Sequence, residues 1–117
     1  LEWQWAQYLG QGVISCYQGT QLFDTAEGLA LAQKYVAFYN DHRVILNKDV
    51  VHVRRPDARS YDCMVHVDPN PAAAERALGW IFNPTSTIVT AIVPIPLYYA
   101  NFTMGAEVWH CFPTDRQ

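Results

Sequence analysis

The sequence predicts an α+β fold in which a helix–strand–helix segment is followed by an antiparallel β part. Apolar residues recur at helical spacing in two segments of the first half, and from Asp49 onward the apolar period changes to two. Turn-rich stretches separate the short runs of the second half. We expect one compact domain over residues 1–117, with a mainly helical part at 1–46 and an antiparallel β part at 47–117.

The first two predicted elements are a short helix and a buried strand. Trp3, Ala6 and Leu9 recur at helical spacing, and Gly10 suits the C-terminal end of that helix. The apolar, β-rich run at 12–17 that follows is short and closed by a glycine, which predicts a buried strand.

A long helix is predicted over 24–43. Asp24 and Thr25 offer an N-cap, Glu27 places a carboxylate in the first turn, and no proline interrupts the segment. The helix carries two neighbouring apolar stripes: Leu31, Tyr35, Phe38 and His42 in one, Leu29, Ala32, Val36 and Tyr39 in the other. We expect both stripes to be buried, so that Val36→Asp unfolds the protein.

The β part begins with a predicted antiparallel hairpin. Val51 and Val53 alternate with polar neighbours, and the same alternation places Cys63, Val65 and Val67 on one face of a second strand. Weaker signals follow the hairpin: a helical turn at 72–77, then strands at 78–82, 87–93 and 107–112.

Composition limits the function classes. Half of the residues are hydrophobic and 14% are aromatic, which excludes disorder, whereas only 16% are charged. So few charges predict that apolar surface is covered by another chain or by a missing domain, and we expect a homo-oligomer, most simply a dimer. The net charge of −3 gives no basis for a nucleic-acid partner.

The chain shows no targeting or membrane signal, and its cysteines form no complete set of pairs. It contains neither a signal peptide nor an apolar run long enough to cross a bilayer, so we expect no membrane partner and assign no compartment. The odd number of cysteines (Cys16, Cys63 and Cys111) excludes a full disulfide framework within one chain.

Several motifs, taken in their order, resemble the C-terminal region of α-galactosidase-like glycoside hydrolases. The matching stretches span about residues 6–99 and include Tyr8-Leu9-Gly10-Gln11-Gly12-Val13, Cys16-Tyr17-Gln18-Gly19, Leu22-Phe23-Asp24-Thr25, Asn47 to Pro56, Tyr61 to Pro69 and Phe82-Asn83-Pro84. The resemblance implies that the helix–strand–helix segment is the remnant of a TIM-type barrel, which needs roughly 250 residues, and that a β-sandwich follows.

The resemblance also implies where a sugar would bind. In such a family two aspartates at the ends of earlier barrel strands perform the chemistry, and those strands are absent from this chain. No catalytic carboxylate is therefore assigned. Tyr17 and Gln18, which follow the last barrel strand in the resemblance, would line the sugar pocket on the substrate face of a barrel.

Two histidines are the strongest candidates for catalysis from the sequence itself. If the hairpin pairs Arg55 with Cys63, His52 lies directly opposite His66, about 5 Å away between Cβ atoms. The two imidazoles, with Asp68 or Asp57 as a third ligand, would then form a zinc site of the hydrolytic type. The alternative is two half-exposed histidines on a polar sheet face, without a metal.

Arginines near the hairpin loop are candidate substrate-binding residues. Arg54, with Arg55 and Arg59 close to it in sequence, could hold an anion or a carboxylate, and solvated charges are the alternative.

Three hypotheses of function follow. The first is a non-catalytic fragment of a carbohydrate-active enzyme that takes a carbohydrate or small-molecule ligand. The second is a small metal-assisted hydrolase of esters, phosphoesters or glycosides that uses His52 and His66. The third is a structural, β-rich interaction module.

Overall fold

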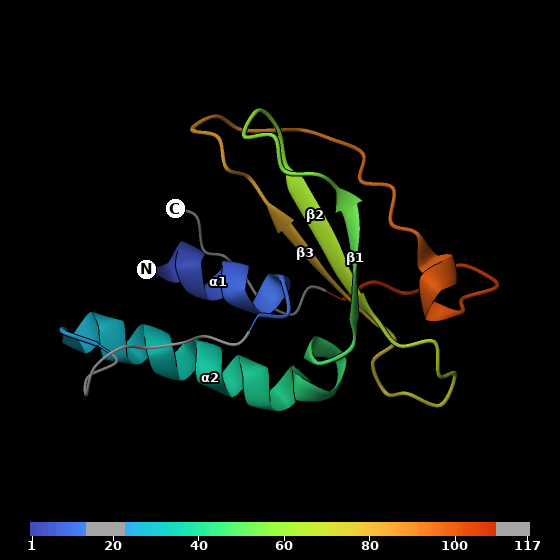
Figure 1. The fold of residues 1–117 in the computed structure, drawn as a ribbon, viewed down its shortest axis with the longest axis horizontal. Coiled ribbons are helices and arrows are strands. Elements are labelled where there is room, and N and C mark those ends of the chain that lie inside the picture. Colours follow the sequence, from blue (N-terminus) through green and yellow to red (C-terminus); the bar gives the residue numbers. More distant parts are fainter. Residues whose placement is uncertain (14–22, 110–117) are drawn as a thin grey trace.

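The computed structural model describes residues 1–13 and 23–109 and has an α+β fold (Figure 1). Its elements are α1 (Glu2–Gly10), α2 (Ala26–Leu46), β1 (Asp49–Arg54), β2 (Asp62–Val67), β3 (Ala77–Phe82) and the 3-10 helix η1 (Leu97–Ala100). The strands form an antiparallel sheet of order β1-β2-β3. The prediction of an α+β fold with an antiparallel β part is confirmed. The strand predicted at 12–17 lies almost wholly outside the described residues.

The long helix is confirmed, with the predicted N-terminus. The Thr25 hydroxyl accepts a hydrogen bond from the Gly28 amide at 3.0 Å, which satisfies one of the free N–H groups of the first turn. The helix continues three residues beyond the predicted end, to Leu46. None of the helices in the described residues is long and apolar enough to cross a membrane.

The second stripe of α2 is buried only in part, at Ala32, so the prediction that both stripes are buried is wrong. Val36 is 47% exposed and Tyr39 is 37% exposed, whereas Tyr35 and Phe38 are buried. The helix packs on α1 and on one sheet, which together cover a single side of its surface. The apolar residues on its other side therefore face solvent.

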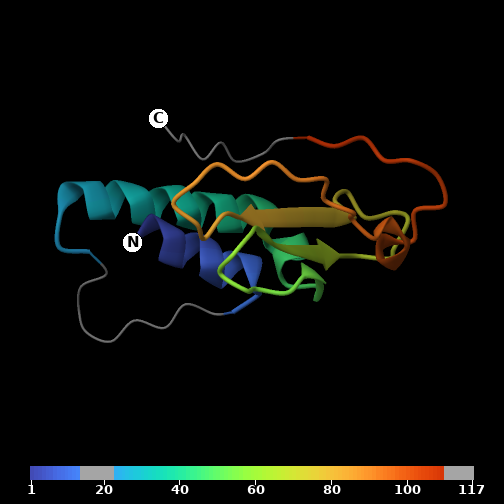
Figure 2. The same cartoon turned by 90° about the horizontal axis from the view of Figure 1, so that it is seen from above.

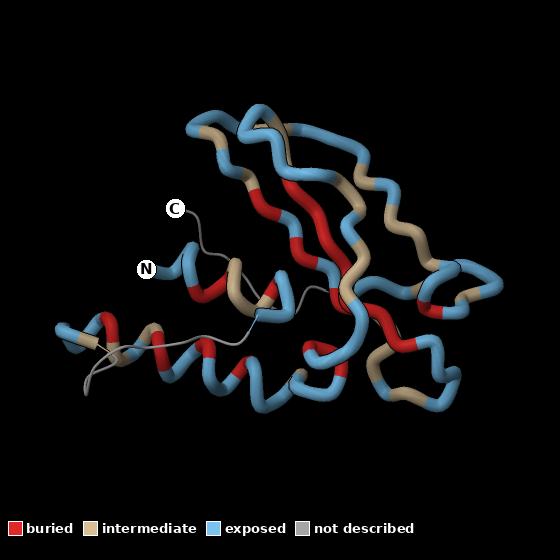
Figure 3. The backbone as a smooth tube through the Cα atoms, in the orientation of Figure 1, coloured by how far each residue is buried: buried red, intermediate tan, exposed pale blue. Residues whose placement is uncertain are grey.

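Two layers cover the sheet, one on each face (Figure 2). Helices α1 and α2 lie side by side on one face, over a core that contains Met64, Leu78, Trp80 and Phe82. On the other face Val65 and Val67 pack against Ala100, Ile95 and Phe102 from the C-terminal part of the chain. All six residues of the central strand β2 are consequently buried, as the continuous buried colour along it shows in Figure 3. The alternative of two half-exposed histidines on a polar sheet face is therefore wrong for His66, which is buried, while His52 on β1 is exposed.

The later elements follow the sequence prediction only in part. The strand predicted at 78–82 is present as β3, which is one residue longer. Residues 72–77 form no helical turn, and 87–93 form no strand in the structure. Residues 107–109 have no regular structure, and the rest of the strand predicted at 107–112 lies outside the described residues.

A matched pair of aspartate substitutions tests the orientation of α2. Ala32 is 6% exposed in the core between α2 and its neighbours, whereas Val36, one turn later, is 47% exposed. Because a buried unpaired charge is costly, Ala32→Asp should lower the free energy of unfolding by about 2 kcal/mol or more. Val36→Asp should change it by only about 0.5 kcal/mol. Urea denaturation of both variants measures the difference, and equal losses would contradict this orientation.

Candidate functional site

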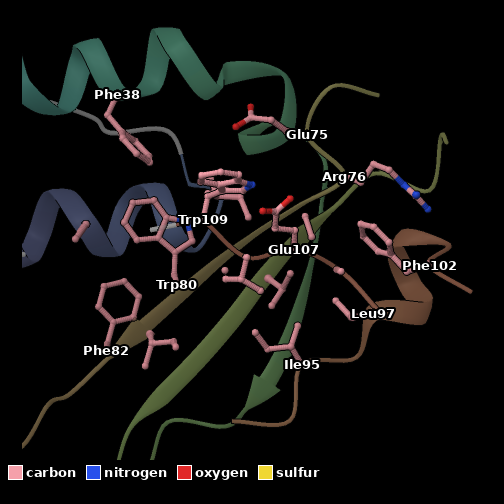
Figure 4. A pocket seen from close by; sticks show the side chains of 18 of the residues that line it. Phe38, Glu75, Arg76, Trp80, Phe82, Ile95, Leu97, Phe102, Glu107 and Trp109 are labelled. Atoms are coloured by element: carbon pink, nitrogen blue, oxygen red, sulfur yellow. The ribbon is translucent and has the colours of Figure 1, made fainter. Parts of the chain in front are cut away.

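A groove of about 1040 Å³ runs along β3, which is an outer strand of the sheet (Figure 4). We call it the β3 groove. One wall comes from α1 and α2, through Trp3, Ala6, Tyr35 and Phe38. The opposite wall comes from the C-terminal part of the chain, through Ile95, Leu97, Phe102 and residues 106–109. The groove is thus the space between the two layers where the sheet ends.

Four aromatic side chains form a continuous row on the helix side of the β3 groove. Trp3 meets Phe82 edge-on with ring centroids 5.4 Å apart, and Phe82 stacks on Trp80 at 6.0 Å with an interplanar angle of 8°. Phe38 then meets the edge of Trp80 at 5.6 Å. We call these four residues the aromatic row. Alternation along β3 places Trp80 and Phe82 on the same face, and the helices supply the other two.

Gly10 at the end of α1 allows this packing. A Cβ atom at position 10 would lie 3.0 Å from Cζ of Phe82 and 3.1 Å from Cγ of Trp80. Any side chain there would force these two rings of the aromatic row to move. The glycine predicted to end the helix therefore has a second role, because it lets α1 approach β3 closely.

Trp80 carries the polar group that distinguishes this groove from ordinary core. The residue is 8% exposed, and its indole Nε1 is buried without a hydrogen-bond acceptor in the described part of the chain. An indole nitrogen is a donor only, and buried donors of this kind are nearly always paired. An oxygen of a molecule bound in the β3 groove would supply the missing acceptor.

The charged side chains around the β3 groove are mostly held by other residues. Glu75 pairs with Nδ1 of His42 at 2.5 Å, and Glu2 pairs with Lys34 at 3.2 Å. Arg76 donates to the Ala100 carbonyl, and its guanidinium lies 4.0 Å from the ring centroid of Phe102.

Tyr35 and Glu107 add a neutral hydroxyl and a carboxylate to the lining. Burial, with a smaller contribution from the charge of Glu2, raises the pKa of Tyr35 to about 12, so its hydroxyl stays protonated at neutral pH. Glu107 is an exposed residue on the C-terminal wall, and its carboxylate is visible beside Trp109 in Figure 4. The groove therefore combines an apolar lining with a few polar groups, as small-molecule sites do.

The register of the hairpin differs from the one that the histidine hypothesis required. Arg54, and not Arg55, pairs with Cys63, and an irregularity between His52 and Arg54 shifts the register once more. His66 consequently lies opposite Val50, while His52 lies opposite Met64. The predicted direct pairing of the two histidines is wrong, and they are diagonal neighbours.

The environments of the two histidines also differ. His52 is exposed, whereas His66 is fully buried, with Nε2 at 3.0 Å from both the Leu9 and the Gly10 carbonyl oxygens. A nitrogen between two carbonyl oxygens carries a proton and donates it, so Nε2 is not free to bind a metal. Burial lowers the pKa of His66, while the Gly10 and Leu9 carbonyls partly oppose this effect. His66 thus fastens α1 to the sheet as a neutral imidazole.

Asp68, the proposed third metal ligand, is held in a structural role. One carboxylate oxygen accepts from the Asn70 amide at 3.0 Å, and the other pairs with Lys48 at 3.1 Å. These contacts lower the pKa of Asp68, the Asn70 amide more than the ammonium group of Lys48. Within 1–13 and 23–109, no group of three or more His, Cys, Asp and Glu side chains is arranged to hold a metal ion. The described residues therefore do not bring His52, His66 and Asp68 into the arrangement that the zinc hypothesis required.

Arg54 is engaged within the hairpin. Its guanidinium pairs with Asp57 at 2.7 Å, donates to the Tyr61 carbonyl and lies 5.1 Å from the centroid of the Tyr61 ring. The hydrogen bond from Arg54, together with the amides of Arg59 and Ser60, lowers the pKa of Asp57 to about 2. Arg54 thus orders the turn, away from the β3 groove.

Tyr17 and Gln18, the other predicted substrate-binding residues, lie outside the described residues.

The β3 groove was not predicted from the sequence. The alternation of Leu78, Trp80 and Phe82 was a visible signal for one apolar strand face, but a period of two does not tell a packed face from a groove.

Comparison of the chain with protein-family models, with curated proteins and with solved structures finds no match.

A pair of glutamine substitutions tests the role of His66. Because burial lowers its pKa in the folded state, the folded protein favours the neutral ring. Its contribution to stability is therefore complete above the unfolded pKa near 6.5 and is lost as pH falls below that value. His66→Gln, whose amide can still donate to the Leu9 and Gly10 carbonyls, should remove this dependence between about pH 7.5 and 5.5.

The control is His52→Gln, which changes an exposed histidine and should leave the pH profile of the melting temperature unaltered. Thermal unfolding across the same pH range measures both variants. A wild-type profile in His66→Gln would contradict the assignment.

Proposed function

We propose that this chain is a non-catalytic, carbohydrate-binding part of a carbohydrate-active enzyme, and that the β3 groove binds the sugar. The observation that carries the proposal is the aromatic row together with the Trp80 indole nitrogen, a buried donor without an acceptor in the described residues. The motif resemblance to α-galactosidase-like glycoside hydrolases points to the same ligand class. In this proposal α1 and α2 are remnants of a TIM-type barrel.

The chemistry of a sugar suits both features of the groove. A pyranose ring has an apolar face of C–H groups, which packs on indole and phenyl rings through dispersion and burial. Its edge carries hydroxyl groups, whose oxygens would accept a hydrogen bond from Nε1 of Trp80. Exposed Trp3 and Trp109, at 42% and 77%, also line the groove and offer rings on which a sugar would stack.

Binding without hydrolysis follows from the carboxylates of the groove. Glycoside hydrolysis generally needs two carboxyl groups on either side of the scissile bond, one as acid and the other as nucleophile or base. Glu75 and Glu2 are paired with His42 and Lys34, and their roles are to orient neighbouring side chains. Among the described lining residues, Glu107 is then the single carboxylate left, which does not make a catalytic pair.

Replacement of the exposed tryptophans tests the site. Trp3→Ala and Trp109→Ala should each weaken oligosaccharide binding about fivefold or more, because each removes one stacking face worth about 1 kcal/mol. Trp80→Phe keeps an aromatic ring but loses the N–H donor, and should also weaken binding. Isothermal titration calorimetry with a panel of galacto-, gluco-, manno- and xylo-oligosaccharides measures these effects.

Tyr98→Ala is the matched control, since Tyr98 is 68% exposed and lies outside the groove lining. It should leave affinity unchanged, and melting temperatures should confirm that all four variants are folded. The proposal fails if no sugar in the panel binds, or if the tryptophan variants bind as tightly as the parent protein.

A further inference from the structure

Residues 87–93 form an exposed apolar segment that lies away from helices α1 and α2 (Figures 1 and 2). The segment reads Thr-Ile-Val-Thr-Ala-Ile-Val and contains neither charge nor proline. Ile88 is 96% exposed and Ile92 is 94% exposed, the highest values among the exposed large hydrophobic residues described. Two isoleucines left this open to water call for a covering surface.

Most main-chain groups of this segment also lack a partner in the described residues, and the Thr87 amide, one of the exceptions, donates to the Thr85 hydroxyl at 3.4 Å. Among the described residues, 87–93 make no backbone–backbone hydrogen bond. The carbonyl of Thr87 accepts from the side chains of Asn83 and Thr85, and the carbonyl of Ile92 accepts from the Tyr61 hydroxyl at 3.4 Å. The β-branched composition predicts a strand, yet the described chain offers it no partner strand. A strand from another molecule would supply the partner that this strand-forming segment lacks in the described chain.

The segment is complementary to itself in antiparallel orientation. With Thr90 opposite Thr90 of a second copy, Ile88 of each chain lies opposite Ile92 of the other, and Val89 lies opposite Ala91. This register pairs all seven residues, whereas a shift of two in either direction pairs only five. The pairing is also isologous, as a twofold-symmetric dimer requires.

We propose that residues 87–93 form an intermolecular antiparallel β-ladder with the same segment of a second copy of this chain. The two cross-strand Ile88–Ile92 contacts cover the exposed isoleucines, and the ladder pairs the free main-chain groups. A ladder of this length buries less area than a standard stable interface, so the dimer dissociates on dilution. The proposal is independent of sugar binding, because none of these seven residues lines the β3 groove.

Complementary charges test the register. Ile88→Lys should be monomeric alone, because two lysines introduced at position 88 would each face an isoleucine across the ladder. Ile92→Glu should be monomeric for the same reason. An equimolar mixture of the two variants should recover a heterodimer, since the introduced lysine and glutamate then lie opposite each other. Light scattering across a dilution series measures the parent protein, each variant and the mixture.

Cross-linking tests the twofold axis directly. In a Cys16→Ser, Cys111→Ser background, Thr90→Cys should form an intermolecular disulfide on mild oxidation, while buried Cys63 does not react. Thr103→Cys, another exposed threonine outside the segment, is the control and should not cross-link. A monomeric parent at high concentration overturns the proposal. Dimers that persist in Ile88→Lys, or equal cross-linking at 90 and 103, overturn it as well.

Discussion

The structure depends on the buried imidazole of His66 and its contact with the end of α1. Nε2 lies 3.0 Å from the carbonyl oxygens of Leu9 and Gly10, which are among the last carbonyls of the helix and lack an intrahelical partner. The central strand thereby supplies a donor to both carbonyls at the helix terminus, where Leu9 also accepts from the Gly12 amide at 3.2 Å. This contact fixes where α1 ends relative to the sheet. It also explains why a histidine can occupy a fully buried position on the helix face of β2.

The position of α1 in turn determines the β3 groove. With Gly10 against Phe82 and Trp80, Trp3 at the other end of the helix reaches the edge of Phe82. The second helix adds Phe38 to the same aromatic row. The opposite layer lines the same groove through Ile95 and Phe102, so the groove lies between the two layers beside β3. A groove lined by aromatic rings results, and Nε1 of Trp80, buried without an acceptor in the described residues, is where we propose that a ligand oxygen binds.

Elements set by local chemistry were predictable from the sequence. The Thr25 cap, the long helix and the hairpin follow from capping, helical spacing and alternation, which neighbouring residues determine. The register was not predictable, because it depends on the turn ordered by Arg54 and Asp57 and on the irregularity near His52. Each shifts the pairing by one residue, and together they separate the two histidines. Burial of His66 and exposure of Val36 depend on which layers cover each face of the sheet and of α2. The spacing of apolar residues in one segment does not predict this.

The most direct test of the account follows the indole N–H signals by ¹⁵N-edited nuclear magnetic resonance while an oligosaccharide is added. In the proposed complex a sugar oxygen accepts a hydrogen bond from Nε1 of Trp80 and the sugar stacks on Trp3, whereas Trp5 lies in the core beside Tyr35. The Trp80 signal, assigned through Trp80→Phe, should therefore move and become protected from solvent exchange, the Trp3 signal should move with it, and the Trp5 signal should change least. A Trp80 signal that stays fixed while the protein binds sugar would contradict the β3 groove as the binding site.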